Sequence, residues 1–431
     1  GMGVGVSLSG LAGAVAAAGG VGVISTAQIG YRDPDFARNP IESNLKAVGV
    51  EIKKARELAA GGIIGVNIMV ATRRYEDYVR AAAAAGVDLI ISGAGLPMTL
   101  PELAGSAKIA PIVSSRKALG VIAKHWKKKY DRKPDLVVVE GPLAGGHLGF
   151  SKEDIDAYTV TKEKDYDAEI REIIALADEL EVPVVVAGGV YEQKDLAHYL
   201  AMGAKGVQLA TRFVTTRECD ASNAYKQAYL DAKKEDIVIV KSPVGMPGRA
   251  IHNAFLDKVQ AGERFMRGCR QCIITCKPDT APYCITEALI NAVEGNLDEG
   301  LIFCGSNAYR ADRIETVADI MEEFSTIRIA GTGSALPEKI VTNFDLQELV
   351  ETSDEWIQKR TGIAQRRVST GETVSTLAAK ACKRALEMAG KKAAEVDMIL
   401  VATCSPELLL PCCACQVQDL IGAADAVAFD L

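Results

Sequence analysis

Aromatic residues and positive charge are both scarce in this sequence. Only 5% of the 431 residues are aromatic, and the 49 Lys and Arg residues are outnumbered by 56 Asp and Glu residues, which leaves a formal net charge of −7. An acidic chain has no general electrostatic attraction to nucleic acid or to an anionic membrane surface. The composition therefore argues against a nucleic-acid-binding protein and against a membrane partner.

Charge is absent altogether from residues 1–31, so a secretory signal or a membrane span has to be considered. Eight of the first 22 residues are Gly, however, and no basic segment precedes the apolar run. We expect a buried helix and strand there instead. Nothing indicates secretion, so the sequence predicts a cytoplasmic protein whose eleven Cys residues are reduced.

Short apolar segments rich in β-branched residues recur along the first half of the chain. They are 21–26, 63–70, 89–95, 109–115, 136–142, 182–189 and 206–213. Helical patterns lie between them at 40–60, 75–86, 116–128, 167–180 and 191–202. Near-continuous apolar strands that alternate with helices predict a parallel sheet covered on both faces. Seven such strands favour a (β/α)8 TIM barrel, with a doubly wound open sheet as the alternative.

Three domains or domain parts follow from this pattern. Residues 1–219 begin on a loop and a helix (8–18) where a barrel would have its first strand, so we expect a TIM barrel that lacks that strand. Residues 220–325 are predicted to be a mostly helical, Cys-rich cap that completes the barrel domain. Residues 326–431 restart the α/β pattern without a Gly/Pro/Ser linker and predict a second domain.

Two strand ends carry residues suited to a phosphate. Gly188 and Gly189 follow VPVVVA, and Ala210 and Thr211 follow GVQL, at the two strand ends where TIM barrels often bind phosphate. Glycine lets backbone N–H groups approach an anion closely. Glycine also ends strands for purely steric reasons, so this pattern alone leaves both interpretations open.

The loop EGPLAGGHLGF (140–150) places one His between paired glycines at a strand end. Together with GMGVG, GVNIM, ISGAG, VVAGGV and GVQLATRF, it makes residues 1 to about 324 resemble the 2-nitropropane dioxygenase family. That family contains nitronate monooxygenases and the related flavin-type enoyl-ACP reductases. The resemblance implies FMN as cofactor, lined by Asn67, Glu140, Gly145, Gly188, Gly189, Gln208, Leu209, Ala210 and Thr211. Glu140 stands where the family often has Gln, and Ala210 where it usually has Gly.

The same resemblance makes His147 the catalytic residue, a base or proton donor beside the flavin. An imidazole with a pKa near ~6.5 can serve either role at neutral pH. The other three histidines have simpler explanations. His125 lies on a basic helix face, His198 lies in a helix and His252 lies in RAIHNAF, so we expect structural or solvated roles for them.

Four cysteines, Cys269, Cys272, Cys276 and Cys284, have the spacing C-x2-C-x3-C-x7-C. That spacing could hold zinc or an iron–sulfur cluster, or the segment could be loop and helix with packed free thiols. The activities of the resembled family need no metal, so we assign none.

The last part of the chain carries a second resemblance. TIRIAGTGSALPEKIVTN, TSDEWIQKRTGI and ACQVQDLIGAADAVAFDL resemble β-ketoacyl-ACP synthase III, an enzyme of the thiolase fold. The resemblance implies that Trp356 and Arg360 contact the adenine of CoA. The family's nucleophilic Cys follows the AFDL strand, so residues 326–431 are expected to be a truncated, inactive domain, with Cys415 in its core.

Three functions therefore remain open. The first is an FMN enzyme that oxidises alkyl nitronates with O2. The second is an NAD(P)H-dependent enoyl-ACP reductase acting on an enoyl thioester, which the attached ketosynthase-like segment favours. The third is a non-enzymatic fragment. Acyl carrier protein or CoA, and a second copy of the chain, are possible partners in the first two cases.

Overall fold

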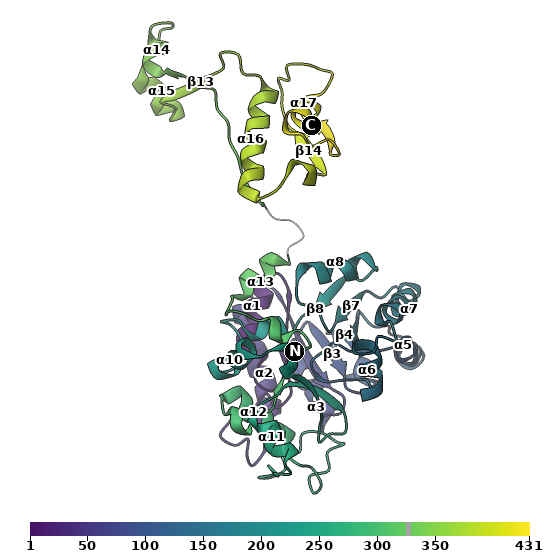
Figure 1. Ribbon diagram of the computed structural model, residues 1–431. Coiled ribbons are helices and arrows are strands. Elements are labelled where there is room, and N and C mark those ends of the chain that lie inside the picture. The colour runs from purple at the N-terminus through teal and green to yellow at the C-terminus, as the bar shows by residue number, and fades with distance from the viewer. Residues whose placement is uncertain (325–328) are drawn as a thin grey trace. The chain divides into compact units, whose positions relative to one another are not determined.

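The seven apolar segments of the first half form one parallel sheet in the computed structural model, which describes residues 1–324 and 329–431 (Figure 1). Neighbouring strands follow the order β1-β2-β3-β4-β5-β7-β8. The strands are β1 (Val21–Ser25), β2 (Ile63–Met69), β3 (Leu89–Gly93), β4 (Lys108–Val113), β5 (Val137–Glu140), β7 (Val184–Ala187) and β8 (Gly206–Gln208). Because the order never reverses, the sheet has the winding of a (β/α)8 barrel and not that of a doubly wound sheet. The predicted mixed α/β architecture with a parallel sheet is confirmed.

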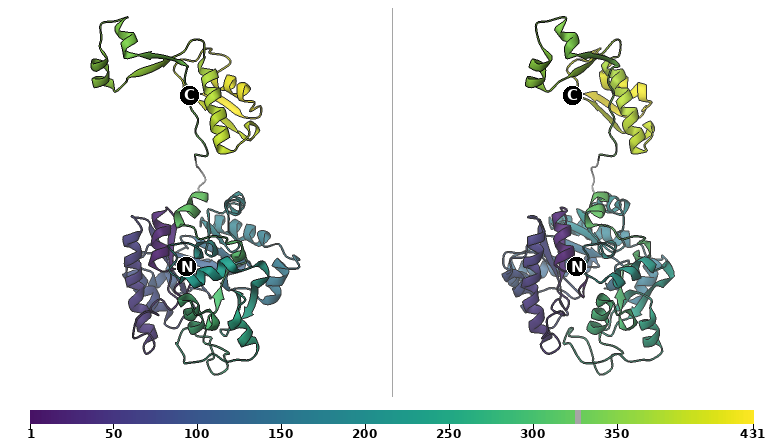
Figure 2. Two further views of the ribbon diagram at one scale, coloured as in Figure 1. Left: turned by 60° about the vertical axis from the view of Figure 1, so that its left-hand side comes forward. Right: turned by 90° about the vertical axis from the view of Figure 1, so that its left-hand side faces the viewer.

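Helices connect these strands and surround the sheet (Figure 1). They are α1 (Ser9–Ala17), α2 (Pro40–Leu58), α3 (Tyr75–Ala84), α4 (Leu100–Leu103), α5 (Arg116–Tyr130), α6 (Lys152–Thr159), α7 (Tyr166–Glu179), α8 (Gln193–Ala201) and α9 (Thr211–Val214). Helices α1 and α2, coloured purple, pack side by side in both views of Figure 2. No helix in the described part of the chain is long and apolar enough to cross a membrane.

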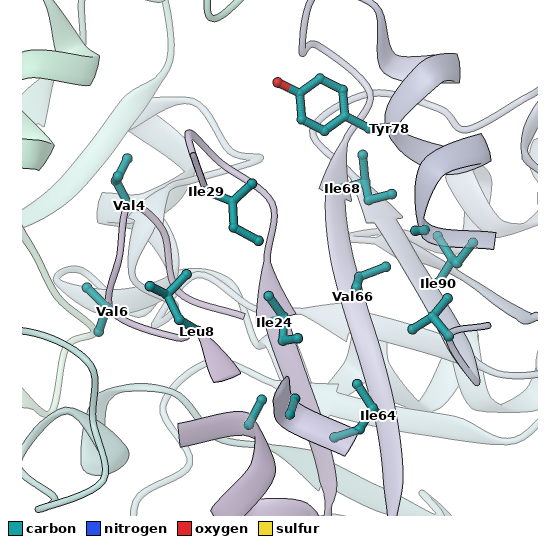
Figure 3. Close-up of a cluster of buried hydrophobic side chains, with 14 of the residues drawn as sticks. Val4, Val6, Leu8, Ile24, Ile29, Ile64, Val66, Ile68, Tyr78 and Ile90 are labelled. Carbon is teal, nitrogen blue, oxygen red and sulfur yellow. The ribbon is translucent and has the colours of Figure 1, made fainter. Parts of the chain in front are cut away.

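Both faces of the sheet are buried, as near-continuous apolar strands require. Ile64, Val66 and Ile68 alternate along β2 and are fully buried in a cluster with residues of the neighbouring strands and the N-terminal loop (Figure 3). The opposite face buries a second cluster that includes Ile91 and Val138. Each such side chain contributes roughly 1.5–3 kcal/mol when it leaves water.

The N-terminal loop is held by a residue far along the chain. Helix α1 has no acidic residue in its first turn and no side-chain cap of its own. The Asp220 carboxylate instead accepts hydrogen bonds from the N–H groups of Leu8, Gly10 and Leu11. A carboxylate at a helix N-terminus satisfies these donors and suits the helix dipole.

The segment 220–325, predicted to be a mostly helical cap, also contains strands. This segment contains α10 (Asn223–Asp231), α11 (Ala254–Gln260), α12 (Ile285–Glu294) and α13 (Val317–Glu323), but also β9 (Ile237–Lys241), β10 (Pro247–Ile251) and β11 (Ile302–Phe303). Strand β10 pairs antiparallel with β9 on one side and, on the other, with β11 and with β6 (Gly146–His147). Strand β10 begins with Pro and contains Gly and Arg, so its local sequence gives no strand signal.

Residues 326–431 form a separate compact unit, and residues 1–325 form the other. Its elements are β12 (Lys339–Thr342), α14 (Asn343–Gln347), α15 (Asp354–Thr361), β13 (Gln365–Val368), α16 (Val374–Ala389), β14 (Met398–Val401), α17 (Cys413–Ile421) and β15 (Val427–Asp430). Side chains at Thr342, Ser353 and Thr373 cap α14, α15 and α16. Strands β14 and β15 pair in parallel beside α16 and α17.

Candidate active site

A cavity of about 480 Å³ lies at the carboxyl ends of the sheet strands. The last residue of each of the seven strands lines it: Ser25, Met69, Gly93, Val113, Glu140, Ala187 and Gln208. This is the end of a (β/α)8 sheet where enzymes of that fold place their active sites. The volume is that of a pocket for a small molecule or cofactor.

Most of the residues predicted to hold FMN line this cavity. They are Asn67, Glu140, Gly145, Gly188, Gly189, Gln208, Ala210 and Thr211, and His147 lines it as well. Leu209 is not part of the lining. Its side chain packs in an apolar cluster with Leu11, Phe213 and Ile320, because successive residues of an extended chain point to opposite sides.

Backbone pairing and a buried cation hold the loop that carries His147. His147 lies in β6, opposite Gly248 of β10. The guanidinium of Arg249, which is 5% exposed, donates to the carbonyl oxygens of Pro142 and Ala144. The loop 140–147 is therefore fixed to β10 both by strand pairing and by the Arg249 guanidinium, so the imidazole has a defined place at the cavity wall.

The imidazole of His147 has two neighbours. Its Nε2 lies 2.7 Å from the Oγ of Ser242, and the Phe303 ring meets it edge-on with centroids 4.9 Å apart. Burial lowers the pKa of His147 from 6.5 to about 4. The expectation of an ordinary imidazole pKa is therefore wrong, because the ring is half-buried and not freely solvated. At neutral pH the ring is neutral and can accept a proton, but it is not a ready proton donor.

Ser242 acts here as a positioning residue for His147. Replacing Ser242 with Ala removes the one side-chain hydrogen bond that the structure gives the ring, worth about 0.5–1.5 kcal/mol. We expect kcat to fall about three- to tenfold with KM nearly unchanged, and Ser242→Thr to retain most of the activity. Steady-state kinetics across pH measures this. An unchanged kcat, or an equal loss in the Thr variant, would contradict the positioning role.

Glu140 is a second ionisable group at the cavity. It ends β5, and burial raises its pKa from 4.5 to about 7. The hydroxyl of Tyr166 donates to the Glu140 backbone carbonyl at 3.0 Å and so holds this strand end. A carboxyl group that is partly protonated at neutral pH can donate a hydrogen bond to a ligand, which an ionised carboxylate cannot do.

The raised pKa of Glu140 makes stability depend on pH. The unfolded chain ionises this carboxyl near pH 4.5 and the folded chain near pH 7, so its contribution is complete below pH 4.5 and is lost as pH rises to 7. Glu140→Gln should therefore stabilise the flavin-free chain at pH 8 by on the order of 2 kcal/mol, and hardly at all at pH 4.5. Denaturant unfolding at both pH values measures this. The exposed Glu57→Gln is the control, and an equal gain in both variants would contradict the assignment.

A second loop completes the predicted phosphate end of the cavity. Gly188 and Gly189 have φ of 94° and 83°, a conformation that favours glycine. The N–H of Gly305 donates to Oγ1 of Thr211 at 3.0 Å, and the side-chain amide of Asn307 donates to the Gly189 carbonyl at 2.7 Å. The Oγ of Ser306 is buried, has no hydrogen-bond partner in the described residues and is not part of the cavity lining. The two positive-φ glycines at the cavity wall fit an anionic group.

Sequence reasoning missed every cavity residue that comes from 220–324. Phe303, Cys304 and Gly305 line the cavity from β11 and its following turn, and Tyr225 and Tyr229 line it from α10. Both tyrosine hydroxyls donate to the Phe303 carbonyl, at 3.3 and 2.6 Å. The one available signal was CGSN at 304–307, a small-residue turn directly after an apolar pair.

The other three histidines lie outside the cavity lining. Nε2 of His198 lies 2.8 Å from Asp167, and Nε2 of His252 lies 3.0 Å from Asp257. His125 is in α5. None of the three is placed to act on a molecule in the cavity.

The four cysteines between residues 269 and 284 line one small hollow that shares residues with the cavity. Cys269, Cys272, Cys276 and Cys284 line it, and Cys272 lines the main cavity as well. Burial raises the pKa of the Cys272, Cys276 and Cys284 thiols. Within residues 1–324 and 329–431, no group of three or more His, Cys, Asp or Glu side chains is placed to hold a metal ion.

Trp356 and Arg360 belong to the second unit. They are one turn apart on α15, and the Arg360 guanidinium lies 4.8 Å from the centre of the Trp356 ring. Trp356 is 54% exposed. The structure thus brings these two residues together on an accessible helix surface.

A singly wound parallel sheet with a cavity at its strand ends is the architecture of a (β/α)8-type enzyme fold. Residues 1–326 match the family described as nitronate monooxygenase, and the chain belongs to that family of flavin-dependent oxidoreductases.

Solved structures agree with this family for the first unit. FabK from Thermotoga maritima is 25% identical, with a TM-score of 0.57, and the match covers 75% of this chain and 89% of FabK. A nitroalkane oxidase from Streptomyces ansochromogenes is 20% identical, with a TM-score of 0.56, over 75% of this chain and 92% of the oxidase. At that identity the second likeness shows the fold alone.

The second unit is similar to a different protein. β-Ketoacyl-[acyl-carrier-protein] synthase III from Clostridium acetobutylicum is 53% identical over 107 residues, which are 25% of this chain and 33% of the synthase. The synthase III from Desulfotalea psychrophila is also 53% identical over 107 residues. The chain therefore spans about a third of the length of these curated relatives.

Proposed function

We propose that the first unit binds FMN in its cavity and oxidises alkyl nitronates, or the nitroalkanes from which they form, with O2. FMN, when bound, would accept an electron pair from the substrate and pass it to O2. The residues that would hold it are Asn67, Glu140, Gly145, Gln208 and, at the phosphate, Gly188, Gly189 and Thr211. The positive-φ glycine pair at the cavity wall supports an anionic group at that end.

The position of His147 is the observation that carries this proposal: the ring lies at the cavity wall, with its Nε2 2.7 Å from the Oγ of Ser242. A neutral imidazole at the cavity wall accepts the α-proton of a neutral nitroalkane at its free nitrogen, and it need not lose a proton first. Ser242 does not take the proton itself but orients the ring through its hydrogen bond with Nε2. The aromatic and aliphatic walls, with Phe303 and Ile112 among them, exclude water from the reacting carbon.

A second candidate is an NAD(P)H-dependent enoyl-ACP reductase. The likeness to FabK at 25% identity and the attached ketosynthase-like segment favour it, since both would serve acyl-chain elongation. That reaction needs a proton donor at the substrate. We place this candidate second because the family model that matches residues 1–326 is that of nitronate monooxygenase.

An anaerobic half-reaction separates the candidates. The purified full chain, loaded with FMN, is mixed without O2 either with an alkyl nitronate or with NAD(P)H alone. We expect the nitronate to bleach the yellow flavin absorbance and O2 to restore it. Bleaching by NAD(P)H and none by the nitronate would establish the reductase instead. A chain that retains no flavin in either case would support the non-enzymatic alternative.

We also propose that Trp356 and Arg360 contact the adenine of a CoA thioester in the second unit. The exposed indole and the guanidinium beside it offer a stacking surface for a planar base. The other Trp, Trp126, is fully buried, so quenching of tryptophan fluorescence by CoA would report Trp356. We expect quenching in the parent chain and its loss in Trp356→Phe. Equal quenching in both chains would contradict the proposal.

A further inference from the structure

The ketosynthase-like unit contains a pair of thiols that its proposed CoA contact does not use. The Sγ atoms of Cys412 and Cys415 lie 3.2 Å apart. A disulfide bond is about 2.05 Å long, so the two sulfurs need to approach by roughly 1 Å. Both cysteines are free and half-buried, which leaves them within reach of a small reagent.

The local fold creates this pair. Cys412 is the N-cap of α17, and Cys415 is the third residue of that helix. Residues three apart lie on the same side of a helical turn, so the two thiols face each other. Cys413, between them, points the other way and is fully buried in the core cluster of the unit with Ala414 and Val417. The expectation that Cys415 is a core residue is therefore wrong: Cys415 is half-buried, and it is Cys413 that lies in the core.

We propose that Cys412 and Cys415 form a vicinal dithiol site that low-molecular-weight disulfides convert reversibly to an intramolecular disulfide. One protein thiolate attacks the reagent disulfide, which releases the first small thiol and leaves a mixed disulfide. The second protein thiol then loses its proton to solvent and attacks the mixed disulfide at the protein sulfur, and the second small thiol leaves. The two cysteines together lose two electrons and two protons, and the reagent disulfide gains them.

The surroundings make the pair a dithiol site and not a metal site. The Asp430 carboxylate accepts hydrogen bonds from the N–H groups of Cys413 and Ala414, at 2.8 and 2.7 Å, and so already satisfies the first turn of α17. The hydrogen bond with Cys412, burial and the Asp430 charge all raise the pKa of Cys415. Among the described residues no third ligand is placed to complete a metal site there.

The test uses the full chain, equilibrated in buffers of reduced and oxidised glutathione, quenched, alkylated and digested. We expect the peptide that contains residues 412–415 to lack two hydrogens and to carry no glutathione on Cys412 or Cys415. Cys404, which is exposed and stands alone, is the internal control and can form only a mixed disulfide. Because neighbouring thiols have a high effective concentration, the pair should be mostly oxidised at a glutathione ratio about tenfold more reducing than Cys404 requires.

Two variants sharpen the result. Cys412→Ser and Cys415→Ser should each trap glutathione on the remaining cysteine, whereas Cys382→Ser should leave the disulfide unchanged. A trivalent arsenical, which bridges paired thiols, should block the site in the parent chain and in neither single variant of the pair. Glutathione retained on the parent pair, a bond to Cys413 instead, or full alkylation of both thiols in the oxidising buffer would each overturn the proposal.

Discussion

Replacing His147 with Ala is expected to lower turnover of a neutral nitroalkane by about 10²–10⁴-fold while FMN stays bound. That loss corresponds to about 3–5 kcal/mol of activation free energy. The reason is that His147 is the imidazole at the cavity wall, whereas the residues assigned to the phosphate come from two other loops, after β7 and after β8. Steady-state kinetics together with the flavin content of the purified variant measure both parts of the prediction.

The control for this prediction is the substrate. A preformed nitronate has already lost its proton and should be affected much less than the nitroalkane. The ring also contacts Ser242 and Phe303, so the Ala variant loses packing as well as the base. His147→Gln retains bulk and a hydrogen-bonding group but cannot act as the base, so it tests the loss of the base alone. Full activity of either variant on the neutral nitroalkane, or loss of flavin together with activity, would assign His147 to the scaffold.

Gly145→Ala is expected to weaken FMN binding by one to two orders of magnitude. A Cβ at this position would lie 2.6 Å from the carbonyl carbon of Cys304 and 2.7 Å from the backbone N of Gly305. Backbone atoms cannot turn aside as a side chain can, so the 304–307 segment has to move. That segment donates to Thr211 and Gly189, and overpacking of this kind typically costs about 1–3 kcal/mol.

Gly149→Ala provides the matched control in the same loop. A Cβ there meets only Oγ of Ser114, at 3.6 Å, which is an ordinary contact. Titration of the flavin-free chains with FMN should give nearly the parental dissociation constant for the Gly149 variant and a clearly higher one for the Gly145 variant. Similar affinities in the two variants would mean that the 304–307 segment does not shape the site.

Both predictions depend on two parts of the chain that meet only in the folded unit. Strand ends between residues 25 and 208 form one wall of the cavity, and residues from 225 to 305 form the other. In the sequence His147 lies among the residues of the first part. In the structure its strand, β6, pairs with β10 and so joins the sheet of β9, β10 and β11 in the second part. A substitution in either part can therefore change the same site.

The sequence by itself determined the parallel sheet and most of one cavity wall. Strands such as β2 and β5 are apolar on both faces, and only a sheet covered on both sides can bury them. The chain leaves each strand at its carboxyl end, so Asn67, Glu140, Gly188 and Gln208 had to gather at one edge. These features depend on local periodicity, which is readable without a structure.

Only the tertiary structure decided what those residues can do. The pKa of His147 near 4 and that of Glu140 near 7 come from burial in the folded unit, and no local pattern encodes that burial. Strand β10 carries no strand signal and forms because β6, β9 and β11 are there to pair with it. The facing of Cys412 and Cys415 likewise follows from where α17 begins, because a one-residue shift of the helix start would turn one thiol away. Long-range contacts determine how deeply a side chain is buried, which strands pair and which way a side chain faces. These three features determine the chemistry of the site.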